Sequence, residues 1–377
     1  MAFIQTVLAY IFAPLVLVFG WIGPNGGINE DPAQYKQYEN VILFIGDGMG
    51  ENHLRAAVAA DPDTPLVMET MAVRGQSRTN SWPGVSVTDS AAGASALACG
   101  IRNIDGQISV FPLDPLQWFA TPVTLAELAI QKGKLAGVVT TDSTSGATPG
   151  AFSAHSSSRD NEEEVSLGQM ASGLTLIWGA GSASINEAGA KAGGFDKFVT
   201  SKSEMLALNE GERSFGQFNG DDLKNIANPD ATPTLTEMTE TAIDLLDDDP
   251  DGFFLMVEAA HIDKFSHGQD IDNAIRHVRT LDSAVAYAME YAAREGDTLV
   301  LVTADHETGS VTLVDGKYIC TTGSHSGANV PVLVNVEDAG FKSQRAWMNR
   351  QIGVQLGRVM GFGRGEFPSS SFPTMPE

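Results

Sequence analysis

The sequence predicts an α/β protein built on a doubly wound, mostly parallel central sheet with helices on both faces. Short apolar runs rich in β-branched residues recur along the 377-residue chain. Segments with helical periodicity lie between these runs, an alternation typical of parallel sheets. The runs are also nearly continuous in their hydrophobicity, which is typical of strands buried on both faces.

Six apolar runs are the candidate strands, and in chain order they cover residues 40–46, 134–141, 174–181, 252–259, 297–305 and 330–336. Two segments show the clearest helical periodicity. One covers 121–133, with Thr121 as the expected N-cap and Pro122 in the first helical position, and the other runs from Ile271 to Arg294.

The remaining stretches are less regular. Residues 160–173 and 182–232 carry weaker patterns, so residues 160–232 are expected to include peripheral insertions. We therefore expect one large α/β domain over residues 30–377, preceded by a separate N-terminal segment.

That segment, residues 1–29, contains no charged residue, since the first one in the chain is Glu30. Its apolar run of about 20 residues is roughly as long as a helix that crosses a bilayer. It resembles a signal peptide or an N-terminal membrane anchor, although a basic start and an A-x-A cleavage site are missing. Export to the periplasm or the exterior, with or without membrane attachment, is the expectation.

The composition limits the partners and the redox chemistry. A net charge of -24 argues against nucleic acid or an anionic lipid surface as the partner. Bound divalent cations can reverse the sign of the field locally, so an anionic small molecule is not excluded. The two cysteines, Cys99 and Cys320, have no metal-binding spacing, and buried free thiols are expected ahead of a disulfide.

Polar residues gather where the predicted strands end. They are Asp47 after the first strand, Thr141 and Asp142 after the second, Glu258 in the fourth, and Asp305 with His306 at the end of the fifth. Ligands of open α/β sheets bind outside the carboxyl ends of the strands. These side chains are therefore expected to form one site.

Ser90 lies in "TDSAAGASALACG", residues 88–100, ahead of a run of small residues that suits a closely packed helix. The structural interpretation of Ser90 is a helix N-cap. The functional one is a nucleophile, because free N–H groups at a helix start favour an alkoxide and then a covalent phosphate. No histidine base lies nearby in the sequence, so activation would fall to a metal ion.

The segment "EAAHIDKFSHGQD", residues 258–270, is the strongest single motif. Asp263 and His267 stand four residues apart and would share one face of a helix. A carboxylate with an imidazole suits zinc, and the alternative is a solvated acidic turn. "GSHSGANVP" adds His325 in a loop, where a lone histidine is more often a surface residue.

The segment "TSGATPGAFSAHSSSR", residues 144–159, offers two further groups. The Thr148 hydroxyl suits a hard cation, and Arg159 suits a phosphate held by two hydrogen bonds.

Taken in order, "GDGMG", "TDSAAGASAL", "GATPGAFSAHSSSR", "FFLMVEAAHIDK", "TADHETG" and "GSHSGANVPV" resemble the motifs of bacterial-type alkaline phosphatases, over residues 40 to 336 or so. The resemblance implies hydrolysis of phosphate monoesters, two zinc ions, one magnesium ion, a homodimer and export. It assigns Asp263, His267 and His325 to the first zinc; Asp305, His306, Asp47 and Ser90 to the second; and Asp47, Thr148 and Glu258 to magnesium. Arg159 and Lys264 are the expected substrate-binding residues.

One departure from the family pattern concerns the magnesium site. Shortly before Thr148, the family usually has Asp or His, and this chain has Gly146. Lys264 matches a lysine that interacts with such an aspartate, so Lys264 is expected to lack its partner and the third metal to bind weakly.

The expected function is therefore hydrolysis of phosphate monoesters through a phosphoserine intermediate at Ser90. Two rivals stay open: a phosphodiesterase or sulfatase of the same superfamily, and an inactive, metal-stabilised binding protein. The complete set of expected ligands argues against the second rival. The sequence does not indicate the physiological substrate.

Overall fold

The computed structural model describes residues 34–363 and 366–368, except for 86, 113–118 and 344. The predicted N-terminal segment lies outside these residues. The strands are β1 Asn40–Gly46, β2 Val73–Arg78, β3 Phe111–Pro112, β4 Phe119–Ala120, β5 Leu135–Ser143, β6 Leu176–Ala180, β7 Lys197–Val199, β8 Ser214–Phe218, β9 Phe253–Ala259, β10 Thr298–Thr303, β11 Glu307–Thr308, β12 Thr312–Val314, β13 Lys317–Ile319, β14 His325–Ser326, β15 Val330–Val334 and β16 Ala346–Met348.

The helices are α1 Glu51–Ala60, α2 Ser90–Cys99, α3 Leu125–Gln131, α4 Ala147–Ser153, α5 Glu162–Ala171, α6 Glu187–Ala192, α7 Lys202–Met205, α8 Gly220–Asn225, α9 Leu235–Leu246, α10 His261–His267, α11 Ile271–Glu295 and α12 Asn349–Val359, with a short 3-10 helix η2 at Val67–Thr70. Among the described residues, no helix combines the length and the hydrophobicity needed to cross a membrane.

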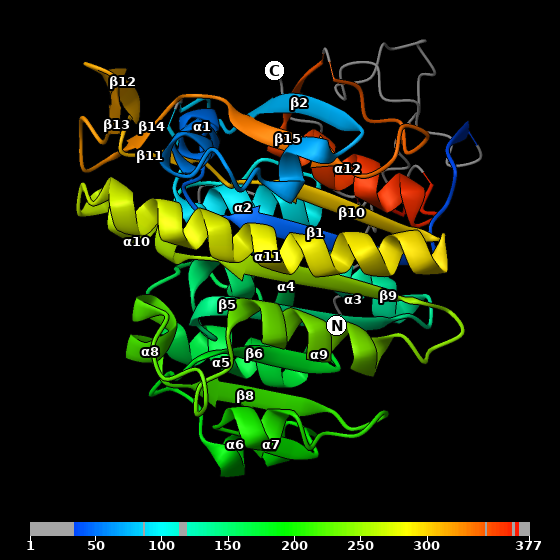
Figure 1. Cartoon of the computed structure of the whole chain (residues 1–377). Helices are drawn as coiled ribbons and strands as arrows, with labels where there is room; N and C mark the ends of the chain where they lie inside the picture. The colour runs from blue at the N-terminus through cyan, green and yellow to red at the C-terminus, as the bar shows by residue number, and fades with distance from the viewer. Residues whose placement is uncertain (1–33, 86, 113–118, 344, 364–365, 369–377) are drawn as a thin grey trace, which may run out of the picture.

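Ten strands form the central sheet, in the order β16-β2-β15-β10-β1-β9-β5-β6-β8-β7 (Figure 1). The pairs on both sides of β1 are parallel, and β15 runs antiparallel to its neighbours β10 and β2. The predicted doubly wound, mostly parallel α/β fold is confirmed.

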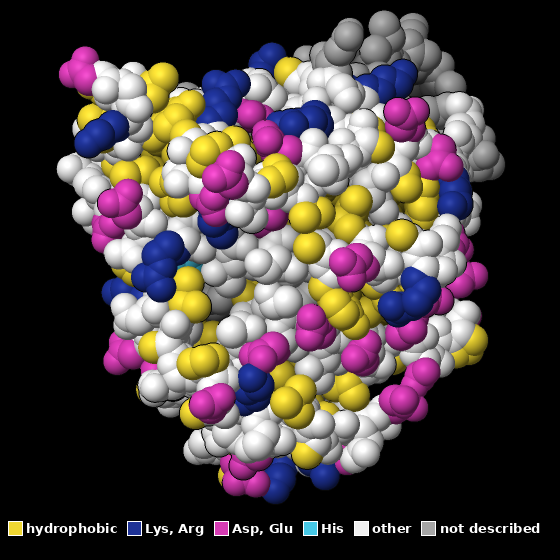
Figure 2. Space-filling view, in the orientation of Figure 1, with side chains coloured by type: hydrophobic (Ala, Val, Ile, Leu, Met, Phe, Trp, Pro, Cys, Tyr) yellow, Lys and Arg dark blue, Asp and Glu magenta, His cyan; other side chains and the backbone are white. Residues whose placement is uncertain are grey.

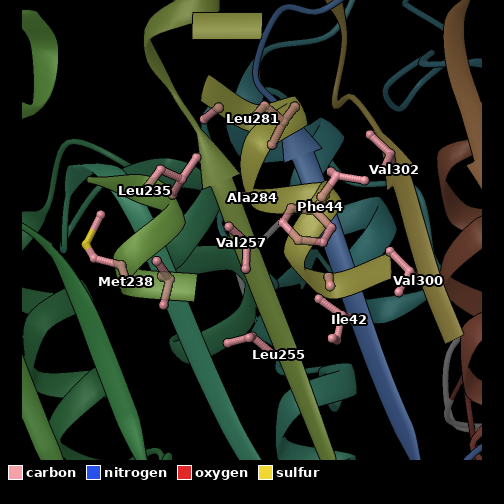
Figure 3. Packing of buried hydrophobic residues seen from close by; sticks show 14 of the residues in the cluster. Ile42, Phe44, Leu235, Met238, Leu255, Val257, Leu281, Ala284, Val300 and Val302 are labelled. Carbon is pink, nitrogen blue, oxygen red and sulfur yellow. The ribbon is translucent and has the colours of Figure 1, made fainter. Parts of the chain in front are cut away.

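Alternation along the buried strands assigns a helix layer to each face of the sheet. Ile42 and Phe44 pack with α1, α9 and α11, whereas Val41, Leu43 and Ile45 pack with α2, α3, α4 and α12. Side chains of a strand point to opposite faces with a period of two, so a strand that is apolar throughout supplies both layers. Figure 3 shows the first layer, where Leu235 and Met238 of α9 and Leu281 of α11 cover Val257 and Phe44.

Several boundaries differ from the prediction for local reasons. Helix α3 begins later than expected, because the Thr124 hydroxyl accepts from the Glu127 N–H and the Glu127 carboxylate accepts from the Thr124 N–H. This reciprocal capping box fixes the start of the helix, so Thr121 is not the N-cap. The stretch 182–232 supplies β7 and β8, which extend the sheet at one edge.

The polar surface and the cysteines fit the composition. Acidic side chains are spread over the face shown in Figure 2 and do not gather in one patch.

Cys99 and Cys320 are both buried and free, as expected.

Candidate metal centre and active site

The carboxyl ends of neighbouring strands bring the acidic residues of the site together. Asp47 follows β1 directly, Glu258 is the next-to-last residue of β9, and Asp305 stands just after β10. Because β10, β1 and β9 are adjacent and parallel, these ends meet at one edge of the sheet. The predicted convergence therefore follows from strand order, with residues more than 200 positions apart in the sequence brought together.

We call Asp47, Asp305 and His306 the inner donor group. His306 Nε2 lies 3.3 Å from Asp305 Oδ2 and 3.6 Å from Asp47 Oδ1. Both carboxylate oxygens are buried and have no hydrogen-bond partner within the described residues. Buried polar atoms are normally satisfied, so two unpartnered oxygens facing an imidazole nitrogen fit a bound cation.

The charge of the inner donor group also fits a cation. Burial, followed by the charges of Asp305 and Asp263, raises the pKa of Asp47 well above its ordinary value, and burial raises the pKa of Asp305. Burial, followed by the neighbouring His325, lowers the pKa of His306 to about 3. The imidazole is therefore neutral, as a metal ligand must be, and a divalent ion would relieve the repulsion between the carboxylates.

The outer donor group, which we define as Asp263, His267 and His325, lies nearer the surface. His267 Nε2 is 3.3 Å from Asp263 Oδ1 and 3.1 Å from His325 Nε2. One oxygen or nitrogen atom from each residue lies within 4.8 Å of the others, and Asp263 makes a similar group with Asp47 and His306. Asp263 therefore stands between the two donor groups.

Backbone carbonyls orient the two outer histidines. His267 Nδ1 lies 2.9 Å from the Gly323 carbonyl oxygen, and His325 Nδ1 lies 2.9 Å from that of Thr88. A carbonyl can only accept, so each Nδ1 carries a proton, and Nε2 is the atom that each ring can offer to a metal ion. The two Nε2 atoms and the Asp263 carboxylate then form three ligands of the kind that zinc prefers.

Ser90 is the first residue of α2, and the N-cap is Asp89, which accepts from the Ala92 N–H at 2.9 Å. The structural interpretation of Ser90 as the N-cap is therefore wrong. Ser90 Oγ lies 3.1 Å from His306 Nε2. The small residues behind it also have a reason, because a Cβ at Gly93 would lie 2.8 Å from the Asp305 carbonyl oxygen. The helix can thus approach the metal-binding strand end closely.

Asp89 also connects Ser90 to Arg159. Its Oδ2 accepts from the Gly106 N–H at 2.9 Å and from Arg159 Nη1 at 3.2 Å. Burial lowers the pKa of Arg159, but the charge and hydrogen bond of Asp89, together with the charges of Asp47 and Asp305, raise it above its ordinary value. The guanidinium is therefore held beside the serine, where it can bind an anion.

The expected magnesium ligands lie on the β9 side of Asp47. Burial, followed by the charge of Asp142, raises the pKa of Glu258 to about 8. The buried Thr148 hydroxyl is close enough to Glu258 to favour its charged form, yet it has no hydrogen bond of good geometry within the described residues. An unpartnered hydroxyl beside the Glu258 carboxylate offers oxygen ligands of the kind that Mg²⁺ prefers.

Lys264 is not without a partner, and the expectation from the sequence is wrong on this point. Its Nζ forms an ion pair with Asp142 Oδ1. The sequence places Asp142 just after the predicted strand 134–141, whereas in the structure it is the next-to-last residue of β5, and no sequence signal indicates that it pairs with Lys264 of α10. Asp142 lies four residues before Gly146, so a comparison of aligned positions alone does not find it.

Thr308 is a second residue that sequence reasoning missed. It is fully buried, its Oγ1 donates to Asp263 Oδ1, and it lies 3.2 Å from His306 Nδ1. Its spacing from His306 could have identified Thr308 in the sequence. In an extended chain, two residues that are two positions apart point to the same side.

Comparisons with known proteins agree with this geometry. The family model for alkaline phosphatase matches residues 38–178 and 172–342. The chain belongs to the alkaline phosphatase family. Alkaline phosphatase 4 of Bacillus subtilis is 33% identical over 304 residues, 75% of this chain and 64% of that protein, and alkaline phosphatase 3 is 32% identical over 78% of this chain and 68% of that protein. The chain thus spans about two thirds of the length of these two relatives.

Solved structures of alkaline phosphatases share the fold. The enzyme from the Antarctic bacterium TAB5 superposes with a TM-score of 0.73 at 28% identity and covers 88% of this chain and 100% of its own. Two TAB5 variants, in which a histidine is replaced by glutamate or aspartate, carry magnesium in a site called M3. The Thermus thermophilus enzyme has a TM-score of 0.76 at 19% identity, covering 88% of this chain and 94% of its own.

Proposed function

We propose that this alkaline phosphatase family member hydrolyses phosphate monoesters through a covalent phosphoserine on Ser90. The observation that carries the proposal is the position of the Ser90 hydroxyl, 3.1 Å from His306 Nε2 at the start of α2. The hydroxyl therefore meets a metal-donor group on one side and the N-terminus of a helix on the other. Both favour an oxyanion and the negative charge of a phosphoryl group.

The metal content follows from the donor atoms. The outer donor group and the inner donor group would each hold a zinc ion, and Asp47, Thr148 and Glu258 would hold magnesium. Magnesium in such a third site is supported by the M3 site of the TAB5 variants. When bound, these ions supply Lewis acidity, which lowers the pKa of a nearby hydroxyl and neutralises phosphoryl oxygens.

The chain's own residues perform the transfer. Arg159, fixed by Asp89, binds two phosphate oxygens and aligns the phosphorus with Ser90. Ser90 Oγ gives its proton to solvent and forms the bond to phosphorus while the bond to the leaving oxygen breaks, and the leaving oxygen takes up a proton from solvent to depart as the alcohol. A water molecule then attacks the phosphoserine from the opposite side, which releases phosphate and restores Ser90. Lys264, held beside the site by Asp142, adds positive charge that favours the anionic substrate.

Hydrolysis of p-nitrophenyl phosphate and of bis-p-nitrophenyl phosphate, with and without EDTA, tests the proposal. The monoester should be strongly preferred, and EDTA should abolish its hydrolysis. Ser90→Ala should lower kcat by about 10³-fold or more and should eliminate acid-trapped phosphoenzyme. Preference for the diester would instead indicate a phosphodiesterase, and phosphoserine elsewhere in the chain would contradict the assignment of Ser90.

Export and assembly stay predictions. The apolar start of the chain is the basis for proposing a periplasmic or extracellular protein, free or anchored, and the family resemblance is the basis for a homodimer. Cell fractionation and sedimentation of the purified protein test them separately.

A further inference from the structure

Gly146 has no conformational reason to be glycine. It is the N-cap of α4 with φ -57° and ψ 163°, angles that any residue can adopt. Steric room, and not backbone conformation, restricts which side chain this position can hold. A Cβ at this position would lie 2.8 Å from Asp142 Oδ2 and 2.9 Å from the Ser143 carbonyl oxygen. The Asp142 carboxylate therefore fills the space that a side chain at 146 would enter.

The Asp142 carboxylate is fixed in this position by its own contacts. Oδ1 accepts from the Ser143 N–H at 2.8 Å and forms the ion pair with Lys264. The oxygen nearest to Gly146 is Oδ2, which takes no part in these two contacts. Burial lowers the pKa of Lys264, but the charge and hydrogen bond of Asp142, together with the charges of Glu258 and Asp47, raise it above its ordinary value.

A threonine connects Asp142 to the expected magnesium ligands. Thr140 Oγ1 donates to Glu258 Oε2 and accepts from the Asp142 N–H at 2.8 Å. The charge of Asp142 also acts on both Glu258 and Asp47, whose pKa values it helps to raise. Asp142 therefore lies beside the expected magnesium ligands, although it belongs to neither the inner nor the outer donor group.

We propose that Asp142 is the positioning residue of the magnesium site in this chain, and that Gly146 is the residue that leaves room for it. Mg²⁺ keeps several of its waters, and these need acceptors to fix them. Asp142 Oδ2 is such an acceptor, held in place by Lys264. The carboxylate that the sequence lacks at position 146 is thus supplied from β5, and the third site is not weakened by its absence. The inference rests on the proposed function.

The test measures magnesium binding directly, by elemental analysis after dialysis and by the rise of the unfolding temperature with Mg²⁺ concentration. Wild type should retain about one magnesium ion per chain through dialysis, the stoichiometry of a single third site. Asp142→Asn should weaken magnesium binding about 10- to 100-fold while zinc content stays unchanged. Glu187→Gln, which breaks the exposed ion pair with Lys191, is the matched control and should bind magnesium like wild type.

A swap of the two positions makes the test sharper. Gly146→Asp alone should weaken magnesium binding, because the new side chain meets the Asp142 carboxylate. Asp142→Gly combined with Gly146→Asp should bind magnesium more tightly than Gly146→Asp alone, because it removes the contact with the Asp142 carboxylate and only the Ser143 carbonyl then has to shift. Circular dichroism and zinc content identify a variant that has not folded. If the variants at position 146 do not fold, the magnesium affinity of Asp142→Asn, which preserves the shape of the side chain, tests the inference.

Two results would overturn the inference: wild-type magnesium affinity in Asp142→Asn, or a double variant that binds no better than Gly146→Asp. A wild-type chain that retains no magnesium would do the same. These results are distinct from a failure of the proposed function, which would appear as missing zinc and missing phosphoserine in the wild-type protein.

Discussion

The two donor groups of this site use similar ligands in different surroundings. In the inner donor group, Asp305 and His306 are fully buried and Asp47 is 5% exposed. In the outer donor group, the His267 side chain is 41% exposed, although Asp263 beside it is buried. Water can replace a missing metal around His267 but not around Asp305. With the proposed ions bound, the inner donor group would depend on its ion for stability, whereas the outer one would depend on its ion mainly for chemistry.

The contrast teaches what burial does to a site rich in acids. Burial raises the pKa of both carboxyl groups, and for Asp47 the charge of Asp305 adds to the rise. Their energy is lowered by a proton or by a cation. A metal ion at neutral pH removes the penalty and fixes the fold of three strand ends at once, so metal binding and stability are coupled there.

The largest expected difference comes from removing one histidine from each donor group. His306→Ala should lower activity by several orders of magnitude and, in the metal-free protein, reduce the unfolding free energy by about 1–3 kcal/mol, since it deletes a buried ring. His267→Ala should change the stability of the metal-free protein by less than about 0.5 kcal/mol, because the ring is exposed. Its activity loss should be partly reversed by excess zinc.

Urea unfolding in EDTA and zinc-dependent activity are the measurements for this pair. His306→Gln is the control for a folding failure of His306→Ala, because it preserves bulk and a hydrogen-bonding atom. Equal destabilisation by the two alanine variants would contradict the distinction between the donor groups.

A pH dependence should accompany the buried acids. In the metal-free protein, burial and then the charge of Asp142 raise the pKa of Glu258 from 4.5 to about 8. The folded state then holds a proton that the unfolded chain has released. Its contribution to stability is full below pH 4.5 and is lost as the pH rises through 8. Asp47 and Asp305, with raised pKa values, act in the same direction.

The unfolding free energy of the metal-free protein should therefore fall by roughly 3 kcal/mol between about pH 5 and pH 8. With zinc and magnesium present, the fall should be smaller or reversed, because the ions stabilise the charged carboxylates. Urea titrations at several pH values, with EDTA or with metals, measure both curves. A metal-free protein that gains stability toward pH 8 would count against the buried acid cluster.

The fold and most of the candidate site could be predicted because their signals are local. Buried strands such as β1 and β9 are apolar throughout, and Asp47 and Glu258 mark their ends. The edge strand β16 and its neighbour β2 were missed because exposed residues interrupt their hydrophobic pattern. The partner of Lys264 could not be predicted. It is Asp142 of β5, and the packing of β5 beside α10 is a long-range contact that no local sequence motif indicates.

Thr308 is the residue that joins the inner and outer donor groups, and its removal gives the smallest expected effect. Its hydroxyl has one proton, which it donates to Asp263 Oδ1, so it must accept from His306 Nδ1 at 3.2 Å. This pattern places the His306 proton on Nδ1 and leaves the Nε2 lone pair free, as in the outer histidines. One hydroxyl thus orients a ligand in each group.

Thr308→Val keeps the shape of the side chain and deletes both hydrogen bonds. We expect zinc affinity to fall about 10- to 100-fold at both sites, with little change in activity at saturating zinc. Thr308→Ser, which retains the hydroxyl, should restore most of the affinity. Competition with a chromogenic chelator measures the two zinc constants separately. If Thr308→Val weakens one site and leaves the other unchanged, the two donor groups are independent, and the hydroxyl serves only the group whose affinity falls.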